Sequence, residues 1–160
     1  MNFPFFRRKK LEPSELSYAA LLIDMQERFL SRYLDSDLEP IISAQTAVLK
    51  FCASQDIPIV VVEYRGYGLT TASLQEVIAA VPRSLRLEKT ITDALASTSL
   101  DEQLRLWNAA DLLLMGIYAS ACVQGTSEGA LEKNYRLHTA RDLIASHSTL
   151  CGEKDGTNFE

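Results

Sequence analysis

The sequence has few of the residues that build metal centres and disulfide frameworks. Among its 160 residues there are three cysteines and two histidines. Cys52, Cys122 and Cys151 are too widely separated for metal-ligand spacing and form no evident disulfide framework. Neither His138 nor His147 has a partner at ligand spacing. We therefore predict that the protein uses no metal and no other cofactor.

Long apolar runs and phosphate-binding motifs are also missing. No apolar run approaches the ~20 residues of a membrane span, so no membrane partner is expected. Neither a G-x-G-x-x-G pattern nor a P-loop lysine motif occurs, so nucleotide binding has no support. The formal net charge of −5 argues against a nucleic-acid partner, because neutralising phosphates requires a basic surface.

The amino terminus does not have the residue order of a secretory signal, in which basic residues come first. Here Phe3, Phe5 and Phe6 precede an unbroken basic run at residues 7–10. We interpret residues 1–17 as a tail on the domain surface, and a membrane-surface or partner anchor is the alternative. Without a signal or a disulfide framework, we expect a cytoplasmic protein.

The chain alternates between apolar runs and segments with helical spacing. Strands are predicted at residues 18–24, 57–64, 84–89, 111–115 and 135–140. Helices are predicted from Pro40 to Cys52, over residues 71–80, from Leu100 onward and over residues 122–133. Residues 25–37 are interpreted as a loop, with or without a helical turn. This alternation predicts an α/β fold, a three-layer Rossmann-like doubly wound parallel sheet flanked by helices, within one domain at residues 18–160.

Three reactive side chains fall at the same edge of that predicted sheet. Asp24 ends the first strand, Lys89 ends the third, and Cys122 follows the fourth. Functional residues of parallel sheets gather outside the carboxyl ends of the strands. Cys122 also opens a helical pattern, and a helix amino terminus favours the reactive thiolate. The alternative is that Cys122 is a small buried hydrophobic residue, the role that we assign to Cys52.

Three short motifs surround these residues. The first, at residues 20–29, is similar to an aliphatic-Asp-x-Gln-x-x-Phe pattern. The second is Glu88-Lys89-Thr90, and the third spans residues 116–126. In this order and strand context they resemble the isochorismatase-like cysteine hydrolase family, over about residues 19–146.

The resemblance implies a cofactor-free hydrolase that cleaves an amide-like C–N bond of a small molecule. Cys122 would attack the carbonyl to form a thioester, Asp24 would take the thiol proton, and Lys89 would hold the cationic side of the site. Members of the family have a cis peptide bond before the cysteine, which here would join Ile117 to Tyr118. The backbone N–H groups of Tyr118 and Cys122 would then form an oxyanion hole.

Three aromatic residues, Phe29, Tyr64 and Tyr118, are the candidates for a substrate pocket. Phe29 either packs on a flat substrate or fills the core, and we interpret Gln26 as an organiser of its loop. The metal-dependent nicotinamidase branch of the family has an Asp-x-His pair after its second strand. Residues 63–68 contain no histidine, which agrees with the prediction of a metal-free site.

Two departures from the family pattern leave the function open. The Ser-Ala-Phe pattern after the lysine is absent, and Thr92-Asp93-Ala94-Leu95 stands nearby. Little sequence follows residues 142–146, so the last strand and helix are missing or the domain is a short variant. A partner subunit would cover the resulting sheet edge, and we expect a homodimer or higher homo-oligomer. A catalytically silent ligand-binding or scaffold protein is the alternative function, and a redox-sensing thiol protein ranks third.

Overall fold

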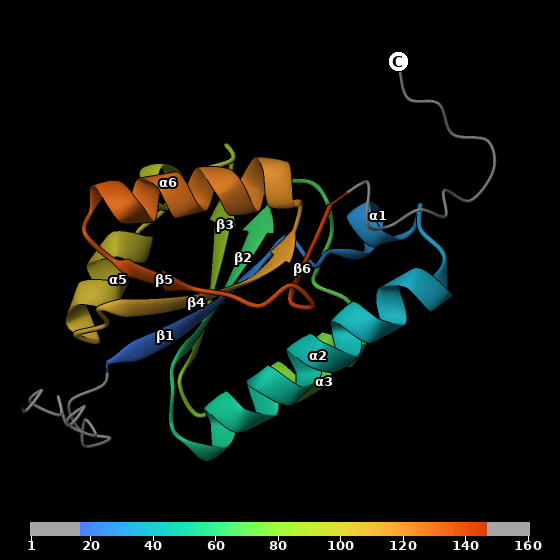
Figure 1. Cartoon of the computed structure of the whole chain (residues 1–160), viewed down its shortest axis with the longest axis horizontal. Coiled ribbons are helices and arrows are strands. Elements are labelled where there is room, and N and C mark those ends of the chain that lie inside the picture. The colour runs from blue at the N-terminus through green and yellow to red at the C-terminus, as the bar shows by residue number, and fades with distance from the viewer. Residues whose placement is uncertain (1–16, 147–160) are drawn as a thin grey trace, which may run out of the picture.

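The computed structural model describes residues 17–146, which form a parallel sheet between two helical layers (Figure 1). The strand order is β3-β2-β1-β4-β5, and β6 pairs with the carboxyl end of β4. The strands are β1 (Tyr18–Ile23), β2 (Ile59–Tyr64), β3 (Ser84–Lys89), β4 (Asp111–Ile117), β5 (Arg136–His138) and β6 (Ile144–Ala145). The helices are α1 (Glu27–Leu30), α2 (Asp35–Ser54), α3 (Ala72–Ile78), α4 (Ala94–Ser97), α5 (Leu100–Leu106), the π-helical turn η2 (Ala119–Val123) and α6 (Gln124–Glu132). The predicted α/β architecture is confirmed.

Alternate residues of β1 face different helical layers. Ala20 and Leu22 pack in one apolar cluster with residues of α2 and α3. Leu21 and Ile23 pack in a second cluster with residues of α4, α5 and α6. Figure 1 shows α2 and α3 below the sheet and α5 and α6 above it. Because β1 is buried on both faces, every position needs an apolar side chain, which explains its continuous apolar run.

The register of the strands sets where they end. Ile23 of β1 lies opposite Gly116 of β4, and Tyr64 of β2 lies opposite Lys89 of β3. Gly116 has a φ of 135°, and a Cβ there would lie 2.0 Å from the Ile23 carbonyl oxygen. Only glycine permits this close approach of the two backbones. The strand pairing thereby places Asp24, Lys89 and the segment after β4 at one edge.

The longest helix begins earlier than predicted. α2 starts at Asp35 rather than at Pro40, so the proline lies inside the helix. Asp35 and Asp37 in the first turn favour a helix start because their charges complement the helix dipole. Leu38 is buried and anchors this turn to the core. The predicted loop at residues 25–37 also contains α1.

The observed bounds of β5 and β2 differ slightly from the predicted ones, and the structure adds the helix α4. α4 was not predicted; it begins after Asp93, whose carboxylate accepts a hydrogen bond from the Leu95 N–H at 2.8 Å. β5 ends at His138, two residues before the predicted end, because it pairs only with the first three residues of β4. β2 begins at Ile59 instead of Ile57. β3 lies at the edge of the sheet, as its alternating pattern predicts.

The carboxyl-terminal part of the sheet contains a strand that the sequence did not predict. Ile144 and Ala145 form β6 and pair in parallel with Gly116 and Ile117 of β4. The predicted tail at residues 1–17 falls outside the described residues except for Ser17, whose carbonyl accepts hydrogen bonds from the N–H groups of Ala110 and Asp111. The predictions for residues 147–160 also fall outside the described residues. Coverage of a sheet edge by a partner subunit stays a prediction.

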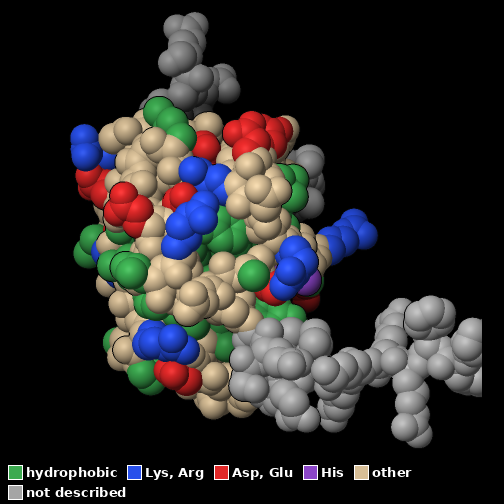
Figure 2. All heavy atoms as spheres, turned by 90° about the vertical axis from the view of Figure 1, so that its left-hand side faces the viewer, with side chains coloured by type: hydrophobic (Ala, Val, Ile, Leu, Met, Phe, Trp, Pro, Cys, Tyr) green, Lys and Arg blue, Asp and Glu red, His purple; other side chains and the backbone are tan. Residues whose placement is uncertain are grey.

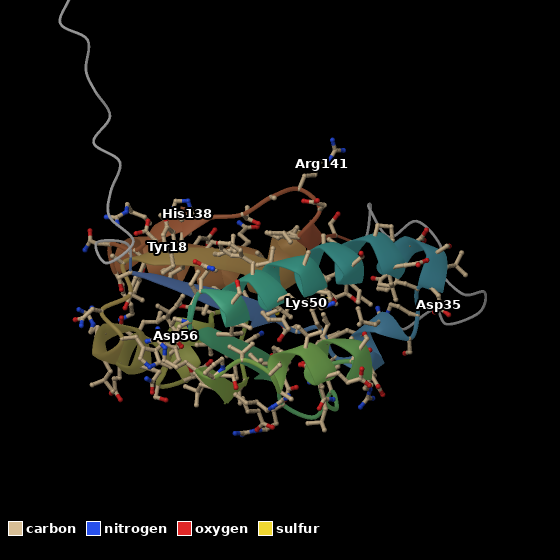
Figure 3. All side chains as sticks on the ribbon, turned by 90° about the horizontal axis from the view of Figure 1, so that it is seen from below. Tyr18, Asp35, Lys50, Asp56, His138 and Arg141 are labelled. Carbon is tan, nitrogen blue, oxygen red and sulfur yellow. The ribbon has the colours of Figure 1, made fainter. Side chains whose placement is uncertain are left out.

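The surface mixes charged and apolar side chains, and α2 runs along one face of the sheet. No helix between residues 17 and 146 is long and apolar enough to cross a membrane. Figure 2 shows acidic, basic and apolar side chains intermixed on the face at the amino end of β1. Figure 3 shows α2 running along the sheet from Asp35 toward Asp56, with Tyr18 and His138 close together. The rings of Tyr18 and His138 are 5.8 Å apart between centroids.

Candidate active site

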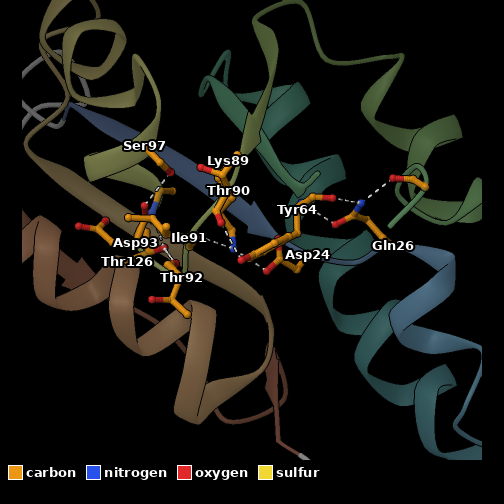
Figure 4. Close-up of polar contacts among 12 residues, drawn as sticks. Asp24, Gln26, Tyr64, Lys89, Thr90, Ile91, Thr92, Asp93, Ser97 and Thr126 are labelled. Carbon is orange, nitrogen blue, oxygen red and sulfur yellow. Dashed lines mark hydrogen bonds and ion pairs between the residues drawn. The ribbon is translucent and has the colours of Figure 1, made fainter. Parts of the chain in front are cut away.

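Asp24, Lys89 and Cys122 come together at the carboxyl edge of the sheet. Lys89 Nζ lies 2.9 Å from Asp24 Oδ2 and donates a hydrogen bond to the Ile91 carbonyl at 3.3 Å (Figure 4). The Cys122 thiol lies beside both charged groups and interacts with each of them. The structure thus unites the three residues that the sequence selected, and their catalytic roles remain predictions.

The ends of three strands place these side chains. Asp24 directly follows β1 with a φ of 54°, a left-handed conformation that Asp tolerates better than most residues. Its N–H donates to the Val62 carbonyl of β2 at 2.9 Å. Lys89 is the last residue of β3. The peptide bond between Ile117 and Tyr118, at the end of β4, is cis, as the family resemblance implies.

The sequence predicted that Cys122 opens a helix. In the structure it lies inside a helical turn instead. The turn η2 begins at Ala119 and has π-helical geometry. The Tyr118 carbonyl accepts hydrogen bonds from the N–H groups of Ala121 at 3.0 Å and Val123 at 3.2 Å. α6 continues from this turn. π-Helical turns are rare and are frequent at functional sites.

The three side chains are shielded from solvent. The exposed fraction is 0% for Lys89, 1% for Asp24 and 7% for Cys122. Burial raises the pKa of the Asp24 carboxyl, and the Lys89 ammonium and the Cys122 thiol partly oppose this rise. Burial also raises the pKa of the Cys122 thiol to about 11; the Asp24 carboxylate adds to this rise, and Lys89 opposes it. The prediction of a thiol biased toward thiolate is therefore wrong, because Cys122 does not lie at a helix start and its removal from water disfavours the charged form.

The Asp24 carboxylate can accept further hydrogen bonds. Within residues 17–146, neither of its oxygens accepts a well-aligned hydrogen bond, although Lys89 and the thiol lie close by. The Lys89 ammonium is also positioned by Tyr64, whose ring centre lies 4.4 Å from Nζ. A buried carboxylate with a raised pKa and an open acceptor position is suited to take a proton from a neighbouring thiol.

We expect alkylation of Cys122 by iodoacetamide to accelerate as the pH rises. Because the thiol pKa is raised to about 11, each pH unit above neutrality increases the thiolate fraction about tenfold. Peptide mapping by mass spectrometry measures the rate at Cys122 across pH, with Cys122→Ala as the control for reaction elsewhere. A rate that levels off below about pH 8 would indicate a preformed thiolate and contradict this expectation.

The three predicted pocket residues lie beside this group as neighbouring aromatic rings. Phe29 meets Tyr64 edge-on at 6.5 Å and Tyr118 edge-on at 5.9 Å between ring centroids. Two tyrosines that the sequence did not single out extend the cluster. The Tyr33 hydroxyl donates to the Tyr118 hydroxyl at 3.1 Å, and Tyr67 stacks on Phe29 at 4.2 Å. The only sequence signal for Tyr67 is its place between two glycines in a predicted turn.

Gln26 organises the neighbouring loop, as the sequence interpretation proposed. Its side chain is fully buried, and its Nε2 donates to the carbonyls of Tyr64 at 3.0 Å and Gly68 at 2.5 Å. Its Oε1 accepts a hydrogen bond from the Tyr64 N–H at 2.7 Å. Gln26 therefore joins the residues after β1 to the loop after β2 and holds Tyr64 beside Lys89 (Figure 4).

The segment that follows Lys89 packs closely against α6. The Thr126 hydroxyl accepts a hydrogen bond from the Ala94 N–H at 3.2 Å. A Cβ at Gly129 would lie 2.3 Å from a carboxylate oxygen of Asp93, so a larger residue at this position would force the Asp93 side chain to shift. These contacts tie the element that carries Lys89 to the helix that follows Cys122.

Two large hollows on the surface lie away from the converging residues. One of about 540 Å³ opens between α1 and α2, where Leu30 and Leu38 contribute to its lining. Another of about 500 Å³ lies at the amino end of β1 and is lined in part by Tyr18 and Phe51. None of Asp24, Lys89 and Cys122 lines either hollow. The burial of all three side chains shows that the candidate site is covered in this conformation.

The histidines contribute no ligand group to this site in the described part of the chain. No group of three or more His, Cys, Asp or Glu residues is arranged to hold a metal ion within residues 17–146. His138 Nε2 instead lies 2.8 Å from Asp111 Oδ1 at the other end of β4. His147 falls outside the described residues, and the absence of a metal stays a prediction.

The fold and the site define a class of protein: a parallel α/β domain with a buried Asp–Lys ion pair beside a cysteine at the carboxyl edge of the sheet. A family model described as the isochorismatase domain matches residues 18–157. The chain belongs to this family.

Several solved structures are similar in fold. An isochorismatase from Pseudomonas putida is 21% identical, with a TM-score of 0.73 over 91% of this chain and 75% of that one. The nicotinamidase from Staphylococcus aureus is 20% identical, with a TM-score of 0.73 and coverages of 82% and 84%. The N-carbamoylsarcosine amidase from Thermoplasma acidophilum is 24% identical, with a TM-score of 0.67 and coverages of 82% and 85%. At these identities the likeness shows the fold alone. No curated protein matches the sequence.

Proposed function

We propose that this protein is a cofactor-free cysteine hydrolase that cleaves an amide-like C–N bond of a small molecule. The observation that carries the proposal is the position of Cys122 beside the buried ion pair of Asp24 and Lys89, whose charged atoms are 2.9 Å apart. Membership of the isochorismatase domain family supports hydrolytic chemistry. Two solved structures of similar fold are a nicotinamidase and an amidase, which favours a C–N bond.

The first step forms a bond between the Cys122 sulfur and the substrate carbonyl carbon. As this bond forms, the thiol proton passes to Asp24, whose raised pKa makes it a stronger base than an ordinary carboxylate. This coupled transfer avoids the need for a free thiolate at a thiol whose pKa is raised to about 11. The oxyanion that develops is stabilised by the backbone N–H groups of Tyr118 and Cys122. Before the transfer, the Lys89 side chain balances the negative charge of Asp24.

The second half of the reaction restores the enzyme. The C–N bond breaks as Asp24 returns its proton to the leaving nitrogen, and a thioester remains on Cys122. Water then attacks the thioester while Asp24 takes a proton from it, and the acid leaves as the thiol is reprotonated. The net reaction is hydrolysis of an amide by one water, with Phe29, Tyr64 and Tyr118 as the proposed walls of the substrate pocket.

A screen of small amides, ureas and carbamoyl compounds for release of ammonia tests this function. We expect turnover of at least one class by the wild-type protein and none by Cys122→Ala. Intact-mass spectrometry during turnover is expected to show the acyl adduct on the wild-type protein only. Release at the same rate by Cys122→Ala, or no release from any class by folded protein, would contradict the proposal.

A catalytically silent ligand-binding protein is the second candidate, and the burial of the site favours it. Cys122 is only 7% exposed, and the two large hollows lie elsewhere. This candidate predicts that compounds from the same screen raise the melting temperature without being hydrolysed.

A further inference from the structure

A second buried carboxylate, that of Glu63 near the end of β2, is not used in the proposed reaction. Its side chain is 8% exposed and forms an ion pair with the Arg86 guanidinium of β3. The same oxygen, Oε1, accepts hydrogen bonds from the Thr70 N–H at 2.6 Å and from the Thr70 hydroxyl at 2.8 Å. Burying a charge is costly unless the charge is paired and hydrogen-bonded, and Glu63 meets both conditions.

The strand register sets Glu63 beside Asp24. Ile23 of β1 lies opposite Val62 of β2, and the Asp24 N–H donates to the Val62 carbonyl at 2.9 Å. Asp24 and Glu63 are therefore the next residues along two hydrogen-bonded strands, and such strands lie about 4.8 Å apart. The pairing of the strands thus brings a second carboxylate-bearing residue close to the candidate base.

Glu63 also reaches Asp24 through contacts of the backbone. Thr70, which Glu63 holds, forms an isolated antiparallel bridge with Gln26, two residues after Asp24. The Gln26 side chain in turn donates to the Gly68 carbonyl of the same loop at 2.5 Å. The segment that follows Asp24 is thereby fastened to the loop that Glu63 holds.

Asp24 is acted on by Lys89 of β3, Cys122 of η2 and Glu63 of β2, the titratable groups around it within residues 17–146. Burial is the largest cause of the raised pKa of this carboxyl, Lys89 and Cys122 lower the pKa, and Glu63 raises it. Like charges in a buried place disfavour each other, because the protein screens them poorly. The counter-charge of Glu63, on Arg86, is 38% exposed. Because water screens Arg86 more than Glu63, the pair leaves a net negative influence on Asp24.

We propose that Glu63 is a positioning residue that keeps Asp24 basic and in place to receive the proton of Cys122. It places a buried negative charge beside the carboxylate, and it fastens the segment after β1 to the loop at Thr70. Arg86 sets how much of that charge acts on Asp24. No proton or electron pair passes through Glu63, so the steps of the reaction are unchanged. The role in catalysis rests on the proposed hydrolase function, whereas the action of Glu63 on Asp24 does not.

Titration of the Asp24 carboxyl by NMR tests this action without any assay of hydrolysis. The carboxyl carbon is observed in full-length protein containing isotope-labelled aspartate, and its signal is identified by its absence from Asp24→Asn/Lys89→Met. In Glu63→Gln the Oε1 acceptor for Thr70 remains and the charge is lost. We expect the ratio of ionised to protonated Asp24 at a given pH to rise about two- to tenfold, which lowers the titration midpoint. Arg86→Met is expected to raise the midpoint, because the Glu63 charge then has no counter-charge.

Glu88→Gln is the matched control for this titration. Glu88 lies opposite Glu63 in the strand register and pairs with Arg65, but that pair is exposed at both ends. We expect the Asp24 midpoint to be unchanged in this variant, because water screens exposed charges. An unchanged midpoint in Glu63→Gln, or a shift in the same direction in Glu63→Gln and Arg86→Met, overturns the proposal. If Glu63→Gln does not fold, the direction of the shift in Arg86→Met decides.

The pH dependence of hydrolysis tests the role in catalysis. The acid limb of kcat/KM reports the protonation of Asp24 in the free enzyme, so we expect Glu63→Gln to move this limb to lower pH. On the plateau, kcat should fall about two- to tenfold, because a weaker base takes the thiol proton less readily. KM should change less than kcat, because Glu63 has no part in holding the substrate.

The two measurements separate this proposal from the proposed function. A shifted titration in Glu63→Gln with an unchanged pH profile overturns the role of Glu63 in catalysis. A shifted titration with no turnover of any amide by the wild type supports the action of Glu63 on Asp24 and contradicts the proposed hydrolase function.

Discussion

Cys122→Ala is expected to abolish amide hydrolysis, with a loss of kcat of at least about 10⁴-fold, because the variant has no nucleophile. The fold should persist, since alanine fits where the buried thiol lies and leaves Asp24 paired with Lys89 at 2.9 Å. Ammonia release gives the turnover number, and thermal unfolding followed by circular dichroism gives the stability. Loss of turnover with a nearly unchanged melting temperature would assign the effect to chemistry.

Cys52→Ala is the matched control for this experiment. Cys52 is also buried, at 1% exposure, and burial raises its pKa to about 11 as well. It lies on α2 among the apolar side chains of the layer below the sheet. We expect Cys52→Ala to lower stability modestly and to leave turnover per folded molecule unchanged. Retained turnover in Cys122→Ala, or an equal loss in both variants, would remove Cys122 from the role of nucleophile.

Lys89→Met is expected to lower the free energy of unfolding by about 3–5 kcal/mol and to remove activity. The side chain of Lys89 is fully buried and faces that of Asp24, which is 2% exposed. Methionine has a similar volume but no charge, so the Asp24 carboxylate would remain buried without a counter-charge. Urea unfolding near neutral pH measures the loss. Arg65→Met is the matched control, because the Arg65–Glu88 pair is exposed at both ends and such pairs contribute about 0–1 kcal/mol.

The pH dependence of the same variant gives a further test. Burial raises the pKa of Asp24, and Lys89 is the strongest influence that lowers it. Without Lys89 this pKa rises further. A carboxyl group with a raised pKa in the folded state contributes stability at low pH and loses it as the pH rises through that pKa. Lys89→Met should therefore recover stability relative to the wild type as the pH falls from about 7 toward about 4.

A double variant separates stability from chemistry. In Asp24→Asn/Lys89→Met neither buried charge remains, and replacing both partners of a buried pair is often nearly neutral for stability. We therefore expect this variant to be more stable than Lys89→Met and still inactive. If Arg65→Met lost as much stability as Lys89→Met, or if the double variant were no more stable than the single one, the account of the ion pair would be wrong.

The strand ends were predictable because burial on both faces leaves a clear local pattern. The run from Ala19 to Ile23 is apolar at every position, so the first polar residue, Asp24, marks the end of the strand. Lys89 was found from a different pattern, as the last residue of the alternating strand β3 at the sheet edge. The start of α2 was not predictable in this way. Its first turn depends on the burial of Leu38 and on helix-end electrostatics, which outweigh the usual preference of Pro40 for a first turn.

The electrostatic state of Cys122 depended on the tertiary structure. A cysteine near a helix start favours the thiolate when only the local sequence is considered. In the folded protein, the thiol is 7% exposed and lies beside the Asp24 carboxylate, so its pKa rises. Desolvation is a property of everything packed around a group, and no sequence motif reports it.

The sequence by itself determined the family, the positions at which β1 and β3 end, and the three candidate side chains at the sheet edge. It could do so because apolar periodicity and short motifs are local properties of the chain. Only the tertiary structure decided that Asp24 and Lys89 form a buried pair, that burial raises the pKa of the Cys122 thiol, and that Tyr67 lies on Phe29. These features arise from contacts between residues far apart in sequence. The stacking of Tyr67 on Phe29 joins the loop after β2 to helix α1 after β1, and it exists only once the sheet has placed the ends of these strands side by side.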